Sequence, residues 1–198
     1  MTLASIGSLT WLRAVDHPEL LGAGTRDALT RWAALDPTVA DRVAVAEIDP
    51  ALADTAALTA AYDLPPAASA NCVVVAGRRA GDERIAAAVV LATTRADVNN
   101  VIRRLLDVRK ASFLPTERAT ELSGMEYGGI TPVGLPAAWR VLIDSRVVAG
   151  DAPGSPAGAE TGGVVIIGSG LRRSKLALPG ALLAELPGAE VVADLATS

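Results

Sequence analysis

Cysteine and histidine are almost absent from this chain of 198 residues, which contains only Cys72 and His17. A single cysteine excludes an internal disulfide framework and a cysteine-based zinc site. Cys72 lies in an apolar run with no histidine near it in sequence, so we expect a buried, inert thiol rather than a nucleophile. His17 precedes a proline near the N-terminus and is interpreted as structural. The sequence therefore predicts no metal site, no cofactor and no conventional catalytic triad.

Aromatic residues and long apolar runs are also scarce. Aromatic side chains make up 3% of the chain, which argues against modules that stack bases on aromatic platforms. The longest apolar run, residues 85–92, suits a buried strand and is far too short to span a membrane. The N-terminus lacks a basic segment followed by an apolar core. We therefore expect a cytoplasmic protein that has no secretory signal and no membrane partner.

Charge is nearly balanced overall but is unevenly distributed. The net charge is −4, which gives no indication of a DNA partner, yet residues 71–118 carry nine basic and five acidic side chains. Two clusters of basic residues stand out, one made of Arg103, Arg104, Arg109 and Lys110, the other of Arg172, Arg173 and Lys175. Each cluster is interpreted either as a surface for a phosphate backbone or as an ordinary solvated helix face or loop.

Apolar periodicity predicts a mixture of helices and strands without regular strand–helix alternation. Helices are expected over residues 9–15, 26–35, 54–62, 98–106, 116–122 and 179–186, and strands over 72–76, 85–91, 141–143, 164–167 and 191–192. The first two strands flank a polar turn and form a predicted hairpin, whereas residues 43–48 suit a strand or a helix end equally. Residues 151–163 contain no apolar anchor and are expected to form a mobile loop or a long hairpin end. The pattern predicts an α/β fold of the mixed α+β type.

The segment 125–136 is the most informative part of the sequence. Its three glycines and two prolines exclude a helix or a central strand. Pro132 removes one amide donor, and the amides of Gly128, Gly129, Ile130 and Thr131 can point toward one acceptor. Such a nest binds an oxyanion or a carbonyl oxygen without a charged side chain. A plain surface turn is the alternative interpretation.

Motifs around this segment occur in a characteristic order. Gly-Gly-Ile-Thr-Pro-Val-Gly at 128–134 follows Leu-Ser-Gly at 122–124, and it precedes a strand ending at Asp144, Ile-Ile-Gly-Ser-Gly at 166–170, and Leu-Ala-Leu-Pro-Gly-Ala-Leu-Leu at 176–183. In this order the motifs resemble those of the YbaK/ProX family of aminoacyl-tRNA editing domains. The resemblance runs from about residue 54 to the C-terminus. It implies an editing domain at 51–198, with a compact, partly barrel-like mixed sheet flanked by helices, and a short helical N-terminal extension at 1–50.

The resemblance also implies a function and a set of site residues. The function is trans-editing, in which the ester of a mischarged aminoacyl-tRNA is hydrolysed and the tRNA acceptor end is the partner. Catalytic roles fall on Gly129 and Asn71. Substrate-binding roles fall on Gly128, Ile130, Thr131, Pro132, Gly134, Asp144, Gly168, Ser169 and Gly170. For Asp144, the ordering of a loop is an equal alternative, and Ser169 is expected to orient substrate or water rather than to attack.

One position departs from the family pattern. Family members carry a lysine, implicated in activity, at the start of the strand after the first helix, and this chain has Asn71 there. Asparagine forms hydrogen bonds but carries no charge. Two functions therefore stay open: a deacylase, or a catalytically impaired module that binds an aminoacyl group, a free amino acid or a protein partner. The extension, with Trp11 and Trp32 as packing anchors, is expected to cap the sheet or to mediate a homodimer.

Overall fold

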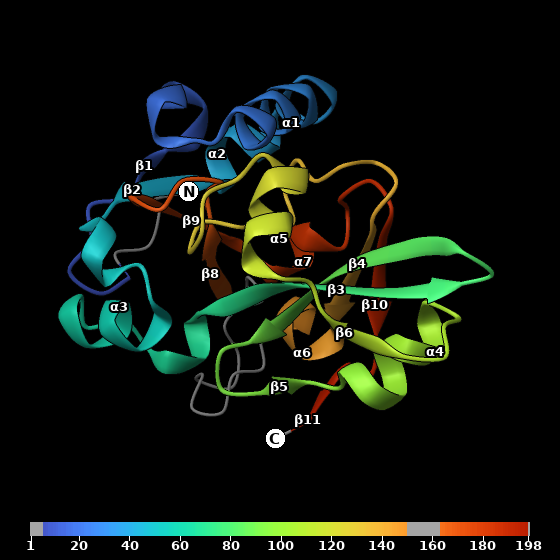
Figure 1. Ribbon diagram of the computed structural model, residues 1–198. Coiled ribbons are helices and arrows are strands. Elements are labelled where there is room, and N and C mark those ends of the chain that lie inside the picture. Colours follow the sequence, from blue (N-terminus) through green and yellow to red (C-terminus); the bar gives the residue numbers. More distant parts are fainter. Residues whose placement is uncertain (1–5, 150–162, 198) are drawn as a thin grey trace.

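The computed structural model describes residues 6–149 and 163–197, which form two main β-sheets covered by short helices (Figure 1). The five-stranded sheet has the order β10-β7-β4-β3-β6, and the four-stranded sheet has the order β1-β2-β9-β8. Their strands are β1 (Leu12–Arg13), β2 (Ala44–Glu47), β3 (Ala70–Arg79), β4 (Asp82–Leu91), β6 (Ala111–Phe113), β7 (Arg140–Asp144), β8 (Val164–Gly168), β9 (Ser174–Pro179) and β10 (Ala189–Val192). A separate two-stranded ladder joins β5 (Arg95–Ala96) to β11 (Ala196–Thr197).

The strand β4 lies in the middle of the larger sheet, antiparallel to β3 and parallel to β7. Val89 and Leu91 face a core shared with the four-stranded sheet, whereas Ala88 and Val90 face a second core on the opposite side. Because both faces of β4 are buried from Ala86 onward, this part of the strand has a continuous apolar sequence rather than an alternating one.

Helices cover the sheets at several places. α1 (Ala23–Leu35) and α2 (Thr38–Arg42) lie over the smaller sheet at the top of Figure 1. The remaining helices are α3 (Thr55–Ala61), α4 (Arg103–Leu105), α5 (Thr116–Ser123), α6 (Ser145–Ala149) and α7 (Gly180–Leu183), with 3-10 turns at Ala14–Asp16, Pro18–Leu20, Pro50–Leu52 and Pro66–Ala68. A π turn, Val98–Ile102, precedes α4.

The predicted α/β fold with a mixed sheet flanked by helices is confirmed. The β3–β4 hairpin is longer than expected, and Ala80 and Gly81 make its tip with φ values of +53° and +95°. The two main sheets are joined by a bridge between Ser69 and Ile166. Within the described ranges this contact does not close them into a barrel, so the architecture is two facing sheets.

The helix predicted over residues 9–15 is wrong. Leu12 and Arg13 pair with β2 in an antiparallel ladder, and β2 continues the sheet to β9. A two-residue edge strand has no periodicity of its own, so its partner in the sheet decides its conformation. The first fifty residues therefore contribute two strands as well as α1 and α2, and Trp11 and Trp32 pack against the cores.

Other elements agree with the sequence patterns in position but differ in extent. The helix expected at 179–186 is the short α7, and the helix expected at 98–106 begins as a π turn. β9 and α6 were not predicted. Of the expected loop 151–163, all but Gly163 lies outside the described residues.

Candidate active site

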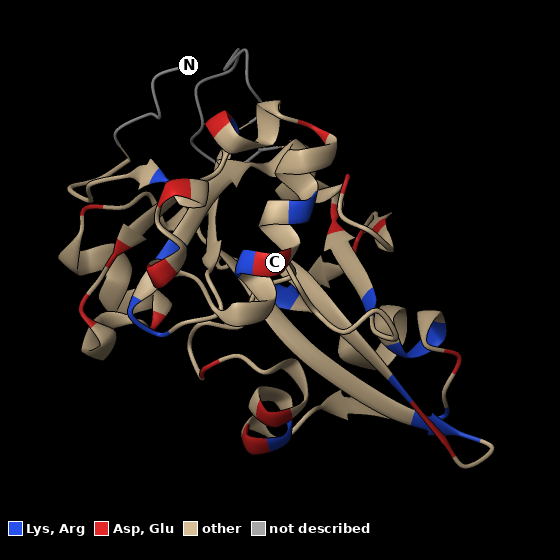
Figure 2. Ribbon diagram, turned by 90° about the horizontal axis from the view of Figure 1, so that it is seen from above, with Lys and Arg blue, Asp and Glu red and all other residues tan. Residues whose placement is uncertain are grey.

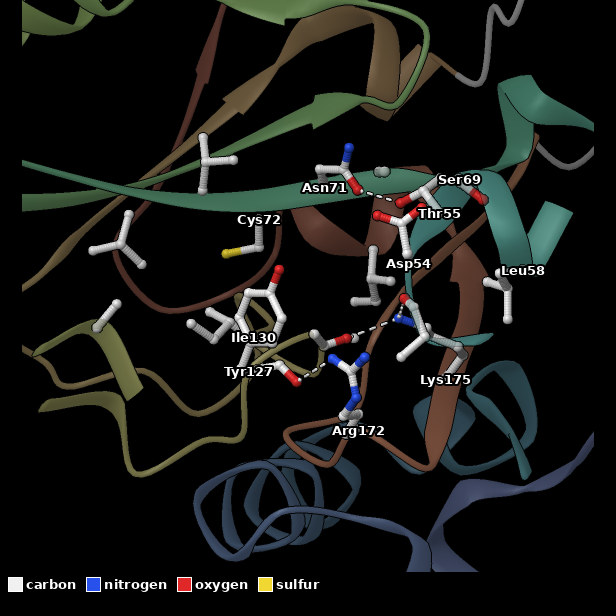
Figure 3. Close-up of a pocket in the computed structure, with 18 of the residues that line it drawn as sticks. Asp54, Thr55, Leu58, Ser69, Asn71, Cys72, Tyr127, Ile130, Arg172 and Lys175 are labelled. Atoms are coloured by element: carbon white, nitrogen blue, oxygen red, sulfur yellow. Dashed lines mark hydrogen bonds between the residues drawn. The ribbon is translucent and has the colours of Figure 1, made fainter. Parts of the chain in front are cut away.

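A cavity of about 410 Å³ lies between the glycine-rich loop, the first half of β3 and the start of α3 (Figure 3). This volume is in the range of small-molecule sites. β8 contributes Ile166, Ile167 and Gly168 to its wall. The polar and charged side chains that line it are those of Asp54, Thr55, Ser69, Asn71, Cys72, Thr116, Tyr127, Arg172 and Lys175.

Asn71 lines the cavity from β3, at its second residue. Its Oδ1 accepts a 2.9 Å hydrogen bond from the Oγ1 of Thr55, the first residue of α3. Asp54 caps that helix by accepting a hydrogen bond from the Ala56 amide at 3.1 Å, as the sequence predicts. The position that the sequence motif aligns with a family lysine thus lies on the cavity wall and presents a neutral amide.

Lys175 brings an ammonium group into the same cavity. The sequence places Lys175 in a basic cluster beside Arg172 and Arg173, but the structure buries it, with only 7% of the residue exposed. Its Nζ donates hydrogen bonds to the carbonyl oxygens of Ala53 at 3.1 Å and Gly128 at 2.9 Å. Burial, assisted by the nearby charge of Arg172 and opposed by Asp54, lowers the pKa of Lys175 to about 8.

The alternation of side chains between the two faces of β9 explains how this lysine becomes buried. Leu176 and Leu178 point into the core between the sheets, whereas Ala177 joins the apolar cluster under α3. Lys175 is two residues before Ala177 and therefore projects to the same side of the strand. The apolar cluster ends there and the cavity begins.

Arg172 and Tyr127 form the rim of the cavity. The guanidinium Nη1 donates to the Tyr127 carbonyl oxygen at 3.2 Å, and the guanidinium carbon lies 5.2 Å from the centre of the Tyr127 ring. This geometry is a cation–π contact. The backbone amide of Arg172 also donates to Glu126 at 2.6 Å. These contacts hold the loop after β8 against the glycine-rich loop.

Cys72 also lines the cavity, and its environment is apolar. Burial raises the pKa of the Cys72 thiol to about 12. The thiol is therefore protonated at neutral pH and is a poor nucleophile. His17 lies apart, in an exposed contact with Glu19.

The glycine-rich loop uses two of its four amides internally. The Gly129 amide donates to the Glu126 carbonyl oxygen at 2.9 Å, and the Thr131 amide faces the sulfur of Met125 at 3.4 Å. The structure thus differs from a nest in which all four amides share one acceptor. The cavity wall receives Gly128 and Ile130 from this loop.

Gly129 packs against the loop that follows β8. Its carbonyl oxygen accepts a 2.7 Å hydrogen bond from the Gly170 amide, and a Cβ at Gly129 would lie 2.5 Å from the Leu171 backbone. Gly168 is equally constrained, because its Cβ would lie 2.3 Å from the Gly129 carbonyl oxygen. These glycines let the two backbones touch, and this contact positions Gly128 at the cavity.

Other predicted site residues lie behind the cavity wall. Ser169 is fully buried and its Oγ lies 2.8 Å from that of Ser174. Gly134 and Gly170 pack against the residues that begin α1. Among the described residues the buried Thr131 Oγ1 has no hydrogen-bond partner, and neither Thr131 nor Pro132 contributes to the cavity lining.

Asp144 lies away from the cavity and holds the C-terminal strand β11 in place. Its carboxylate pairs with Arg146 at 2.8 Å and accepts a hydrogen bond from the Ala196 amide at 3.0 Å. Burial alone would raise the pKa of Asp144, but the hydrogen bonds from Arg146 and Ala196 hold it below its usual value. Of the two roles open from the sequence, this geometry matches the ordering of chain segments.

The basic residues are distributed over several surfaces (Figure 2). Arg109 and Lys110 line a groove of about 390 Å³ together with Arg78 and Arg118, and Phe113 lines both this groove and the cavity. The Nε atoms of Arg103 and Arg104 each donate to a carbonyl oxygen one turn earlier. Arg173 pairs with Glu47 and donates to the Glu19 carbonyl oxygen.

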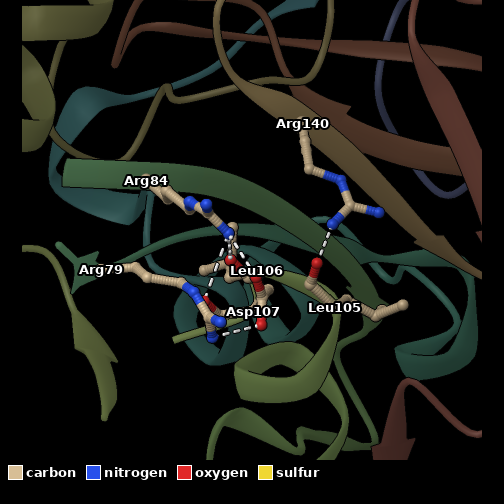
Figure 4. A network of polar contacts seen from close by, with 6 residues as sticks. All are labelled: Arg79, Arg84, Leu105, Leu106, Asp107 and Arg140. Carbon is tan, nitrogen blue, oxygen red and sulfur yellow. Dashed lines mark hydrogen bonds and ion pairs between the residues drawn. The ribbon is translucent and has the colours of Figure 1, made fainter. Parts of the chain in front are cut away.

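Arginines near the tip of the β3–β4 hairpin and at the start of β7 are engaged in a polar network (Figure 4). Arg79 and Arg84 both pair with Asp107, at 2.6 Å and 3.0 Å. Arg140 donates to the Leu105 carbonyl oxygen and pairs with Glu190 at 2.5 Å. This network fixes the turn after α4 to the hairpin.

Sequence reasoning did not find the roles of Lys175 and Phe113 in the cavity wall. The signal for Lys175 is the alternation of β9, and that strand was not predicted. Phe113 carries no local signal, because its exposure of 52% and its place between cavity and groove arise only when β6 pairs with β3.

A family model described as the aminoacyl-tRNA editing domain matches residues 49–174. The match spans more than half of the chain, and the chain therefore belongs to this family. No curated protein matches the chain.

Solved structures show the same fold. The crystal structure of the hypothetical protein APE2540 is 19% identical, with a TM-score of 0.66 over 86% of this chain and 99% of that one. A protein proposed as a trans-editing enzyme for prolyl-tRNA synthetase is 20% identical, with a TM-score of 0.64 over 90% of this chain and 99% of that one.

Two features are absent from the described residues. None of the helices there is long and apolar enough to cross a membrane. In the same parts of the chain, no group of three or more His, Cys, Asp or Glu side chains is arranged to hold a metal ion.

Proposed function

We propose that this protein is a trans-editing aminoacyl-tRNA deacylase that hydrolyses the ester of mischarged aminoacyl-tRNA in the cytoplasm. The observation that carries the proposal is the charge pattern of the cavity in an editing-domain fold. Lys175 and Arg172 place positive charge on its wall, and Asp54 places a negative charge at its edge. An aminoacyl ester has an α-ammonium group and develops negative charge on its carbonyl oxygen during hydrolysis, so it matches both signs.

The aminoacyl group is proposed to enter the cavity beside Asn71, Gly128, Ile130 and Gly168. Gly129 contributes through the shape of the loop, because its contact with the Leu171 backbone fixes the Gly128 carbonyl. The proposed supporting residues behind the wall are Thr131, Pro132, Gly134, Ser169 and Gly170. They determine where the two loops meet.

The tRNA acceptor end is the proposed partner. Its phosphates follow the groove with Arg109 and Lys110, and its terminal adenosine reaches the cavity past Phe113. Arg172 at the cavity rim is proposed to contact the phosphate backbone beside this path, and Arg103, Arg104 and Arg173, on other surfaces, are proposed as further phosphate contacts. Aromatic side chains stack on bases without sequence preference, which suits an exposed phenylalanine at this junction.

A second candidate function is binding of an aminoacyl group or amino acid without hydrolysis. The observation that favours it is Asn71, which is neutral and whose oxygen is already engaged by Thr55. On this alternative, the cavity retains ligand affinity but gives no turnover.

Deacylation of a panel of mischarged aminoacyl-tRNAs tests the proposal, with Gly129→Ala as the site variant. We expect hydrolysis of at least one substrate by the wild type and a loss of about tenfold or more in Gly129→Ala, since a Cβ 2.5 Å from the Leu171 backbone displaces the loop. Gly188→Ala is the control for backbone strain outside the cavity lining, because Gly188 has a φ of +74° but a Cβ there meets no atom within 4 Å. Binding of an uncleaved aminoacyl-tRNA without hydrolysis by the wild type supports the binding module instead.

A further inference from the structure

The ammonium group of Lys175 has one hydrogen bond to spare. An ammonium has three N–H donors, and two of them are used by the carbonyl oxygens of Ala53 and Gly128. Among the described residues the third N–H group has no acceptor, and Lys175 lines the cavity. A buried charge with an unused donor is costly to maintain unless a ligand completes it.

We propose that Lys175 is a catalytic residue of the proposed deacylase, whose Nζ donates its third hydrogen bond to the carbonyl oxygen of the scissile ester. Asp54, at the cavity edge, binds the α-ammonium group of the same substrate. This inference rests on the proposed function and names the group that stabilises the reacting atoms.

The chemical step balances without a further reactant. The oxygen of a water molecule forms a bond to the ester carbonyl carbon, and the carbonyl π pair moves to the oxygen that faces Lys175. The resulting oxyanion re-forms the carbonyl as the bond to the ribose oxygen breaks. One proton of the water ends on that ribose oxygen, the other is released when the carboxylic acid ionises, and Lys175 stays protonated throughout.

The electrostatic surroundings suit this role. The charged and titratable groups that line the cavity together with the ammonium are Asp54 before α3, Cys72 on β3, and Tyr127 and Arg172 at the rim, and of these Asp54 and Arg172 act on its charge. Asp54 favours the charged form of Lys175, while burial and Arg172 disfavour it, with a pKa of about 8 as the result. At neutral pH the group is a desolvated ammonium, and a donor of this kind interacts more strongly with an oxyanion than it would in water.

The neutral Asn71 defines a complementary test. Asn71 and Lys175 line one cavity from opposite sheets, so an ammonium can be removed at one position and added at the other. Lys175→Gln removes the charge but keeps an NH₂ donor for the Gly128 carbonyl oxygen. In that background, Asn71→Lys returns a cation to the cavity from β3.

The experiment measures kcat and KM for the best aminoacyl-tRNA from pH 6 to pH 10, with uncatalysed hydrolysis subtracted. For the wild type we expect kcat to fall as the pH rises through about 8, because the active form is protonated. Lys175→Gln is expected to lower kcat about 100-fold with a smaller change in KM. Its kcat should no longer decrease as the pH rises through about 8. In the Lys175→Gln background, Asn71→Lys should raise kcat about tenfold. Arg31→Gln on α1 is the control.

Each outcome decides between the alternatives. If the wild type is active and Lys175→Gln keeps its kcat, the lysine only holds the Gly128 loop and the inference fails while the proposed function stands. A wild-type kcat that is flat through pH 8 also overturns it. An inactive wild type overturns the proposed function and this inference together. Should Lys175→Gln fail to fold, Lys175→Arg replaces it, since arginine stays charged and moves the fall in kcat beyond pH 10.

Discussion

At the scale of single residues, the buried positive charge of the cavity comes from Lys175 rather than from the position that the sequence motif aligns with a family lysine. Asn71 occupies that position and is held by Thr55. Lys175 arrives from the other sheet and is held by two backbone carbonyls. A charged ammonium that is buried in this way lowers the folding stability of the protein, and such a cost is typical of functional sites.

The first prediction concerns this cost. Because the pKa of Lys175 is lowered from 10.5 to about 8, the unfolded chain binds more protons than the folded chain between these values, and stability rises with pH in that window. Between pH 7 and pH 10.5 the unfolding free energy of the wild type should rise relative to that of Lys175→Met by about 3 kcal/mol. Urea denaturation at several pH values measures it. Lys110→Met, which removes the only other lysine, is the control, and an equal response of both variants would contradict the prediction.

At the scale of elements, Asp144 ties three segments together. It is the last residue of β7, its carboxylate pairs with Arg146 of α6, and it accepts a hydrogen bond from the Ala196 amide of β11. The C-terminal strand is thus attached by a charge-assisted bond as well as by its pairing with β5. Loss of the carboxylate leaves the amide and the guanidinium without their acceptor.

The second prediction is that Asp144→Asn lowers the free energy of unfolding by about 2–4 kcal/mol, because it removes one partner of a mostly buried pair. Since the pKa of Asp144 is lowered in the folded state, the contribution is present above about pH 4 and is lost as the pH falls below it. Asp41→Asn, which breaks an exposed pair with Arg13, should cost less than about 1 kcal/mol. Chemical denaturation at pH 7 and pH 3 tests both, and a pH-independent loss in Asp144→Asn would speak against an ionic role.

Much of the element pattern follows from the sequence, for reasons that the structure makes visible. The β3–β4 hairpin, α3 with its Asp54 cap and α5 are encoded by local periodicity, capping and turn residues. β1 and the burial of Lys175 are not, because each depends on a partner strand that is distant in sequence. The position of Asn71 and the loop at Gly128 were accessible through family motifs, whereas the contribution of β9 to the cavity needed the sheet register.

At the scale of the whole molecule, the cavity and the basic groove are neighbours that share lining residues. Phe113 belongs to the lining of both, and it is exposed at the edge strand β6. Arg118 in the groove is paired with Glu83, but Arg78, Arg109 and Lys110 form no ion pair within the described residues. Positive charge beside an exposed aromatic ring is an arrangement that binds single-stranded nucleic acid in other proteins. The groove is therefore the proposed route of the acceptor end.

The third prediction separates this route from the chemistry. The double variant Arg109→Ala/Lys110→Ala should raise KM for aminoacyl-tRNA and lower the slope of log K against log salt by about 1.5, because two phosphate contacts are lost. Phe113→Ala should raise KM about tenfold through the lost stacking, with little change in the salt slope. Hydrolysis of an aminoacyl ester of adenosine alone should keep its rate in the double variant, since that substrate has no phosphates to place in the groove.

Arg31→Ala/Arg42→Ala removes the same charge from the N-terminal segment and serves as the control. If it weakens tRNA binding as much as Arg109→Ala/Lys110→Ala does, the effect is one of net charge and the acceptor end takes another path.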